Sequence, residues 1–174
     1  MDLEEFNQLL SQHEKDVYTF CYHLAKTRDL ADELYQETVL KSFERMHKID
    51  VSNNPKAFLF TIAIGTWKNM SRKVKRREGI APTLPLTEEL AGYSSNNSVE
   101  KQVEQGIRDK LIRETVSEME DGCRIPMLLM YFGGHSIAEI SQICKIPDGT
   151  VKSRLRKGRG LVKAALEKEG FAIE

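Results

Sequence analysis

The sequence predicts an all-α protein, made of two small helical domains that a flexible linker joins. Apolar residues recur at spacings of three, four and seven along most of the chain, which is the period of amphipathic helices. Proline and glycine are sparse (5 and 11 of 174 residues) and aromatic residues make up 7%, so a β-sandwich or barrel is not expected. Residues 81–98 instead hold Pro, Gly, Ser and Asn in linker proportions. The predicted domains are residues 1–80 and 101–174, with an acidic linker over 81–100.

The N-terminal domain is predicted to contain three long helical stretches. Residues 3–27 form one helix or a helix pair, because their apolar positions keep a helical period. A second helix covers about 30–47, with Asp29 as its N-cap, and it combines a buried stripe with a compact acidic surface. An Asn-Asn-Pro sequence then stops and restarts the helical pattern. A third helix runs from Pro55 to about Arg77, and its last turns are rich in lysine and arginine.

The C-terminal domain begins with a helix and continues into an apolar segment. Helical periodicity resumes near Val99 and continues through Val116. The nearly all-apolar residues 125–132 predict a core helix that is too short to cross a membrane. Two glycines, Gly133 and Gly134, end this helix.

Residues 136–159 are the most informative stretch, because they predict two short helices joined by a tight turn. Ser136 can cap the first helix, and Glu139 three residues later completes a capping box. Pro147 suits the first turn of the second helix, which has one apolar stripe and many cations. This pattern is typical of a helix-turn-helix whose second helix enters a DNA major groove. An amphipathic hairpin with a solvated basic face is the alternative interpretation.

The charge is unevenly distributed although the net charge is zero. Residues 81–121 carry 4 Lys/Arg and 9 Asp/Glu, a net of −5, whereas residues 122–174 carry 9 and 5, a net of +4. Basic blocks therefore flank an acidic middle, which is compatible with a nucleic-acid partner.

Several classes of protein are not expected from this sequence. No apolar run reaches the roughly 20 residues that cross a bilayer, and the acidic N-terminus lacks the order of a signal peptide, so the expected location is the cytoplasm. Three cysteines without C-x-x-C spacing predict buried or free thiols. Cys21 and His23 can form half of a metal site, but no second pair is obvious. No Gly-rich phosphate loop or nucleophile–base pair is present, so we expect no metal, no cofactor and no enzymatic activity.

The order of these features resembles the extracytoplasmic-function (ECF) sigma factors of bacterial RNA polymerase, in the sigma-70 superfamily. L-A-D-E-L-Y-Q-E-T-V (30–39) looks like the family's region 2.2, and N-P-K-A-F-L-F-T-I-A (54–63) looks like the start of its promoter-melting helix. G-T-V-K-S-R-L-R-K-G-R (149–159) is similar to its region 4.2 signature, and this match is the most specific. The resemblance spans roughly residues 3–168. It implies a sigma region 2 domain followed by a sigma region 4 domain.

The resemblance implies that the acidic helix surface binds a coiled coil of the polymerase's largest subunit. Carboxylates beside one apolar anchor suit a partner helix that carries arginine. The alternative is an ordinary solvated helix face. The implied residues are Asp32, Glu33, Leu34, Gln36 and Glu37.

The resemblance also implies that the N-terminal domain recognises and melts the −10 promoter element. Asn53 and Asn54 lie in the loop that would receive a flipped base, and Trp67 can stack on a base. Equally, Trp67 can pack in the core and Asn54 can cap the helix. The backbone contacts are expected from Lys68, Asn69, Arg72, Lys73, Arg76 and Arg77.

The second helix of the helix-turn-helix is expected to read the −35 element. Its first turns face the bases, and arginine pairs well with guanine. Val151 and Leu155 are expected in the core. The predicted base readers are Asp148, Thr150, Lys152, Ser153 and Arg156, and the predicted phosphate contacts are Arg154, Lys157 and Arg159.

The sequence departs from the family at a few positions, and it leaves one rival function open. Gly65 stands where Asn is frequent, Asn69 where Asp is frequent, and M-E-D-G-C-R-I-P (119–126) replaces the Leu-Pro that often opens region 4.1. The rival is a stand-alone, dimeric helix-turn-helix regulator, which leaves the 30–39 and 54–77 patterns unexplained.

The partners that the resemblance implies are core RNA polymerase, through the coiled coil and the flap, and promoter DNA. It also implies an anti-sigma factor, often membrane-bound, which would hold the protein at the membrane. No small-molecule substrate is expected, and the free protein is expected to be a monomer.

Overall fold

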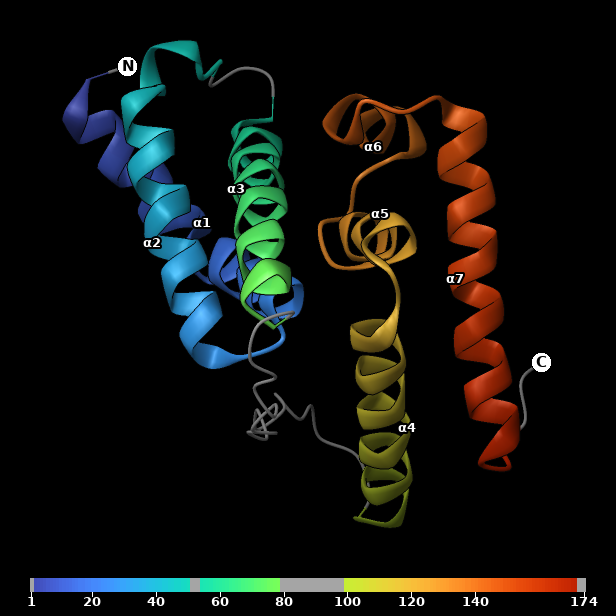
Figure 1. Cartoon of the computed structure of the whole chain (residues 1–174). Coiled ribbons are helices and arrows are strands. Elements are labelled where there is room, and N and C mark those ends of the chain that lie inside the picture. The colour runs from blue at the N-terminus through green and yellow to red at the C-terminus, as the bar shows by residue number, and fades with distance from the viewer. Residues whose placement is uncertain (1, 51–53, 79–98, 172–174) are drawn as a thin grey trace.

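The computed structural model describes residues 2–50, 54–78 and 99–171, with only the backbone for 77–78 and 99–104. Over these residues every element is a helix, which confirms the all-α prediction. Helices α1–α3 form one group and α4–α7 form another, and α3 faces α5 and α6 (Figure 1). The predicted linker lies outside the described residues up to position 98, and its last two residues begin α4.

Helices α1 (Leu3–Ala25) and α2 (Arg28–Glu44) are joined by a short turn. The first stretch is therefore a single helix, which Asp2 opens by accepting a hydrogen bond from the Glu5 backbone N–H. The helix ends at Lys26, which takes a left-handed conformation with φ 69°. The prediction that Asp29 caps α2 is wrong: Thr27 occupies the N-cap position, and Asp29 lies in the first turn, where its charge still suits the helix dipole.

Helix α3 (Pro55–Glu78) follows a short 3-10 helix, η1 (Met46–Lys48), and lies between α2 and the second group of helices (Figure 1). Asn54 precedes it with φ 50°, and the Asn54 side-chain oxygen accepts a hydrogen bond from Ala57 N at 3.1 Å. Asn54 therefore caps α3, as one of the two interpretations of the sequence predicted. The core of the first group includes the stacked rings of Phe20 and Phe60, whose centroids lie 4.3 Å apart.

The second group consists of α4 (Val99–Glu118), α5 (Asp121–Tyr131), α6 (Ile137–Cys144) and α7 (Asp148–Lys168). Helix α5 begins four residues before the predicted apolar segment, so Pro126 lies inside the helix rather than at its start. That proline removes one intrahelical hydrogen bond close to the start of the helix. The core nature of this segment follows from burial of all residues from Cys123 to Leu129.

Helices α6 and α7 form the helix-turn-helix that the sequence predicted; α6 lies beside α3, and α7 runs along the side of the second group that faces away from α3 (Figure 1). The capping box is present: Ser136 Oγ accepts from Glu139 N, and the Glu139 carboxylate accepts from Ser136 N at 2.8 Å. Lys145 takes a left-handed conformation at the turn, and Pro147 occupies the N-cap of α7 rather than its first helical position. Val151 and Leu155, which form the apolar stripe of α7, are fully buried, so the opposite face of the helix lies toward solvent.

Gly133 is expected to tolerate no side chain, because it lies where α5 turns toward α6. A Cβ at this position would lie 2.7 Å from the backbone oxygen of Leu129, 2.6 Å from His135 Cδ2 and 3.0 Å from a ring carbon of Phe60. We expect Gly133→Ala to lower the free energy of unfolding by about 1–3 kcal/mol, measured by denaturant titration. Gly160→Ala is the matched control, because a Cβ there meets nothing and alanine favours a helix. Equal stability of the two variants would contradict this packing.

Candidate nucleic-acid and polymerase interfaces

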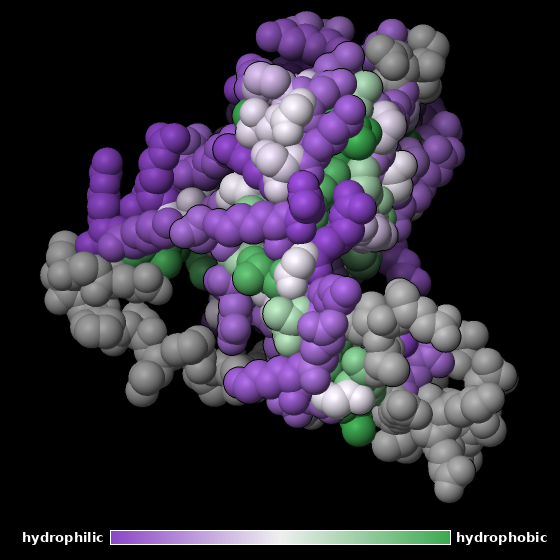
Figure 2. Space-filling model, turned by 90° about the vertical axis from the view of Figure 1, so that its right-hand side faces the viewer, coloured by the Kyte–Doolittle hydropathy of each residue, from purple (hydrophilic) through white to green (hydrophobic). Residues whose placement is uncertain are grey.

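The exposed face of α7 is the most complete candidate interface. Burial of Val151 and Leu155 on one side of the helix turns the polar residues of its first four turns outward. Figure 2 shows the side of the molecule on which α7 lies, and hydrophilic side chains cover most of it. Of the predicted −35 residues, six are exposed: Asp148, Lys152, Ser153, Arg156, Lys157 and Arg159.

Two of the predicted −35 residues lie at the edge of that face. Thr150 is half-buried, and its backbone oxygen accepts a hydrogen bond from Ser153 Oγ at 2.9 Å. Arg154 is also half-buried and points toward α5, because its guanidinium carbon would lie 3.8 Å from a Cβ at Gly122. The DNA contacts of all eight residues stay a prediction.

The C-terminal half of α3 carries a second cationic surface. Lys68, Asn69, Arg72, Lys73 and Arg76 are all exposed. Of the other residues predicted here, Asn53 and the side chain of Arg77 lie outside the described residues.

A groove of about 340 Å³ runs beside this surface, between α2, α3 and α6. Gly65 lines it and leaves the space open. Cations reach the groove from α2, from α3 and from the C-caps of α2 and α6, which makes it suited to a polyanion. They are Lys41, Arg45, Lys68 and Lys145.

Trp67 does not lie open to a base in this structure. Its side chain is 6% exposed, and Nε1–H donates a hydrogen bond to Asp121 Oδ2 at 3.0 Å. The guanidinium of Arg124 lies 5.6 Å from the centroid of a Trp67 ring. Arg124 is itself 1% exposed and bonds Asp121 at 2.5 Å, so these three side chains form one closed cluster.

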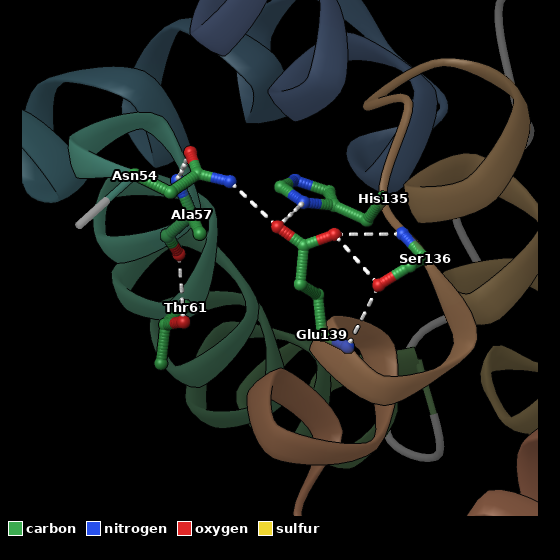
Figure 3. Close-up of polar contacts among 6 residues, drawn as sticks. All are labelled: Asn54, Ala57, Thr61, His135, Ser136 and Glu139. Atoms are coloured by element: carbon green, nitrogen blue, oxygen red, sulfur yellow. Dashed lines mark hydrogen bonds and ion pairs between the residues drawn. The ribbon is translucent and has the colours of Figure 1, made fainter.

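Asn54 likewise already has a partner from the second group of helices. Its side-chain amide donates to Glu139 Oε1 at 2.8 Å, while its oxygen caps α3 (Figure 3). Hydrogen bonds from Ser136 and Asn54 lower the pKa of Glu139 to about 2. The carboxylate therefore stays ionised and keeps accepting these bonds at neutral pH.

The predicted polymerase surface on α2 is partly present. Glu33 and Gln36 are exposed. Glu37 is half-buried and pairs with Lys41 at 3.3 Å, and Asp32 accepts a hydrogen bond from Tyr18 at 2.6 Å.

Leu34 is not the apolar anchor that we predicted. Its side chain is 0% exposed and belongs to the hydrophobic core, so that part of the prediction is wrong.

A groove between α1 and α2 supplies the exposed apolar surface that the sequence analysis missed. It has a volume of about 400 Å³ and includes Gln36 in its lining. Leu40 and Phe43 are 53% and 40% exposed at its edge, and Phe6 meets Phe43 edge to face at 5.8 Å. The surplus of apolar positions on α2, beyond those needed for one buried stripe, was the available signal.

One buried histidine, His135, and one half-buried histidine, His23, are expected to make stability depend on pH. Burial lowers the pKa of His135, with Lys56 adding to this effect and Glu139 opposing it, and burial and Arg113 lower the pKa of His23. The unfolded chain then binds more protons, so the free energy of unfolding falls as the pH drops through 6.5. The imidazole proton signals in an NMR titration should report both midpoints.

The control for this prediction is stability measured in two variants. His135→Gln should flatten the loss of stability on the acid side of neutrality, whereas His47→Gln, at an exposed position, should not. A midpoint above 6.5 for either His135 or His23 would refute the assignment.

Comparison with known families identifies the class of protein that these helices form. The family model for Sigma-70 region 2 matches residues 9–77, and the model for Sigma-70 region 4 matches residues 109–161. Together the two matches cover more than half of the chain. They include the exposed surfaces of α3 and α7 described above. The chain therefore belongs to the sigma-70 family of RNA polymerase sigma factors, and its relatives define the type as the extracytoplasmic-function sigma factors.

The relatives match over most of their length. The chain is 27% identical over 164 residues to the ECF RNA polymerase sigma factor SigM of Bacillus subtilis (strain 168), covering 94% of each chain. It is 26% identical over 151 residues to the ECF RNA polymerase sigma factor EcfG of Rhodopseudomonas palustris (strain TIE-1), covering 87% of this chain and 79% of that protein.

The fold is similar to that of two proteins of solved structure. The sigma factor RpoE, in complex with the anti-sigma factor NepR from Bartonella quintana, matches with a TM-score of 0.77 at 22% identity, over 95% of this chain and 98% of that one. CnrH, in complex with the cytosolic domain of CnrY, matches with a TM-score of 0.66 at 15% identity, over 97% and 92%. Among the described helices, none has the length and apolar character needed to span a membrane.

Proposed function

We propose that this sigma factor binds core RNA polymerase, contacts the −10 and −35 promoter elements, and helps to separate the DNA strands at the start of transcription. The observation that carries the proposal is the presence, in one chain, of both sigma regions with their cationic helices. We assign residues 1–80 to the contacts with the polymerase and the −10 element, residues 81–100 to the linker, and residues 101–174 to the contact with the −35 element. The protein acts in the cytoplasm and has no enzymatic activity of its own.

The polymerase contact is assigned to α2 and the groove beside it. Glu33 and Gln36 are exposed, and Leu40 and Phe43 add the apolar surface that Leu34 does not supply. This combination fits one occupant, a helix of the largest subunit's coiled coil, with apolar side chains in the groove and arginine toward the carboxylates. The flap is assigned to the second group, near α5.

The DNA contacts follow from the two cationic helices. The exposed residues of α7 enter the major groove at the −35 element, with Lys152 and Arg156 at base edges. The exposed cations of α3 follow the backbone at the −10 element. Because one solved structure that it resembles, RpoE, is in complex with the anti-sigma factor NepR, we propose that an anti-sigma factor controls this chain as well.

Association with core polymerase tests this proposal. The purified protein should comigrate with core RNA polymerase in gel filtration, in a one-to-one complex. Polymerase that already carries another sigma factor is the control and should not bind it, because sigma factors occupy the same coiled coil. Absence of association with core polymerase, or equal association with both forms, would refute the proposed function. The stand-alone regulator predicts instead a dimer that binds duplex DNA without polymerase.

A further inference from the structure

The groove between α2, α3 and α6 has room for a small molecule and offers it an apolar surface. Its volume of about 340 Å³ lies within the roughly 300–1,000 Å³ of small-molecule sites. Three buried isoleucines line it, namely Ile62, Ile64 and Ile143. Gly65 lines it without a side chain, and a Cβ at that position would meet no atom within 4 Å. The groove can therefore take a ligand that brings one apolar face.

The charged residues that line the groove are all of one sign. Its twelve lining residues include four cations and no carboxylate. The charge of Lys41 is offset by Glu37, whose carboxylate lies 3.3 Å from its ammonium group. The other three cations have no ion pair with any residue that the structure describes, and they are Arg45, Lys68 and Lys145. An anion in the groove would therefore meet cations that no carboxylate already holds.

Two of these cations also have a structural role, whereas the third does not. Arg45 and Lys145 are the C-caps of α2 and α6, where a positive charge offsets the helix dipole. Lys68 lies in the interior of α3, so the dipole does not account for it. Its charge reaches the end of α6: burial raises the pKa of the Cys144 thiol, and the charges of Lys68 and Arg154 oppose that rise. The potential in the groove is therefore positive beyond what the helix ends require.

The lining also contains polar groups that can recognise a ring by its edge. Asn69 is exposed, and its amide has no hydrogen-bond partner among the described residues. An amide offers one acceptor and two donors, which fit the edge of a nucleobase. The Thr66 hydroxyl, which accepts from Lys41 Nζ at 3.4 Å, adds a further polar group. The groove thus combines an apolar surface, a free amide and unpaired cations, as a nucleotide requires.

We propose that this groove binds a free nucleoside phosphate, with the ring against the isoleucines and Asn69 and the phosphates at the three unpaired cations. A single DNA strand carries the same chemical groups, but helices border the groove on three sides, which favours a short ligand over a continuous strand. Lys68 also belongs to the surface proposed for the −10 backbone, so a bound nucleotide would compete with DNA for it. Only this competition rests on the proposed function.

The test uses ATP as the probe and the full chain, with no DNA and no polymerase. Cys144 lines the groove and is half-buried, so the rate at which iodoacetamide alkylates it reports whether the groove is occupied. ATP at about ten times its dissociation constant, measured by calorimetry, should slow this alkylation about tenfold. Peptide mass spectrometry separates the three cysteines, and the buried Cys21 and Cys123 should stay slow with and without ATP.

One variant fills the groove without changing its charge. Gly65→Gln puts a side chain into the open space and should weaken ATP binding about tenfold or more. Replacing a glycine inside a helix also favours the helix, so lost binding would not reflect lost folding. Gly106→Gln is the matched control, because it makes the same change at an exposed position of α4 where a Cβ also meets nothing. It should bind ATP as the wild type does.

A second variant removes charge without filling the groove. Lys68→Gln together with Lys145→Gln takes away two of the three unpaired cations. Because each charge-assisted hydrogen bond contributes about tenfold or more, the double variant should bind ATP about a hundredfold more weakly. Lys163→Gln with Lys168→Gln removes the same charge from exposed positions at the far end of α7. This control should bind ATP as the wild type does and should protect Cys144 equally.

Each contrary outcome would overturn the nucleotide site. An alkylation rate that millimolar ATP leaves unchanged, or equal ATP binding by Gly65→Gln and Gly106→Gln, would mean that the groove is not occupied. Inorganic triphosphate that binds as tightly as ATP would mean attraction by charge alone. Single-stranded oligothymidylate that protects Cys144 where ATP does not would assign the groove to DNA. A protein that binds ATP here but never associates with polymerase would overturn only the proposed function.

Discussion

Replacing Lys152 and Arg156 together with alanine is expected to lower initiation at this protein's promoters by about a hundredfold or more. Both side chains are exposed on the first turns of α7, above the buried Val151 and Leu155 that hold the helix in position. Each good side-chain contact to a base edge is worth about 1–3 kcal/mol of discrimination, and 1.4 kcal/mol is a factor of ten. Run-off transcription at a fixed polymerase concentration measures the loss.

The control for this prediction removes the same charge from the same helix. Lys163→Ala with Lys168→Ala changes two exposed lysines in the last turns of α7, beyond the predicted contacts with the bases. That variant should retain most initiation, and its duplex binding should fall equally for matched and mismatched −35 sequences. Equal losses in the two double variants would mean that α7 acts through charge alone.

Glu33→Lys is expected to weaken binding to core polymerase by about tenfold to a hundredfold. Glu33 is exposed on α2, three residues before Gln36 of the apolar groove, so the substitution would put a cation opposite the arginine-bearing helix that we propose as partner. Like charges placed across an interface cost several kcal/mol when they are close, and less at a solvated rim. Glu37 is less suitable for this test, because it pairs with Lys41 on its own helix.

The effect of Glu33→Lys should be confined to the polymerase. Glu114→Lys makes the same change at an exposed position of α4 and should bind polymerase as the wild type does. Binding of free Glu33→Lys protein to −35 duplex DNA should also be unchanged. Wild-type affinity of Glu33→Lys for the polymerase would contradict the assignment of α2 as the polymerase surface.

Local signals in the sequence were enough to predict the helix-turn-helix. The Ser136–Glu139 capping box, the Pro147 break and the Val151–Leu155 stripe each depend on residues within one or two turns of each other. The structure contains all three features. Only the position of Pro147 differed, by one residue, because it takes the extended conformation of an N-cap.

Residues whose environment depends on distant contacts could not be predicted in the same way. Asn54 and Glu139 are 85 positions apart in the chain, and nothing in the sequence near either one indicates the other. Trp67 had two possible roles until its partners on α5 were known. Leu34 was assigned to the polymerase surface from the resemblance, whereas the helical period of α2 places it in the buried stripe, where the structure has it.

The central claim is that this chain directs RNA polymerase to promoters with two spaced elements. Run-off transcription with purified core polymerase on a pool of genomic promoter fragments, with and without the protein, tests it most directly. We expect new start sites that require the protein and share a −35 and a −10 element. An unchanged set of transcripts, together with tight binding of the protein alone to duplex DNA, would contradict the claim and favour a stand-alone regulator.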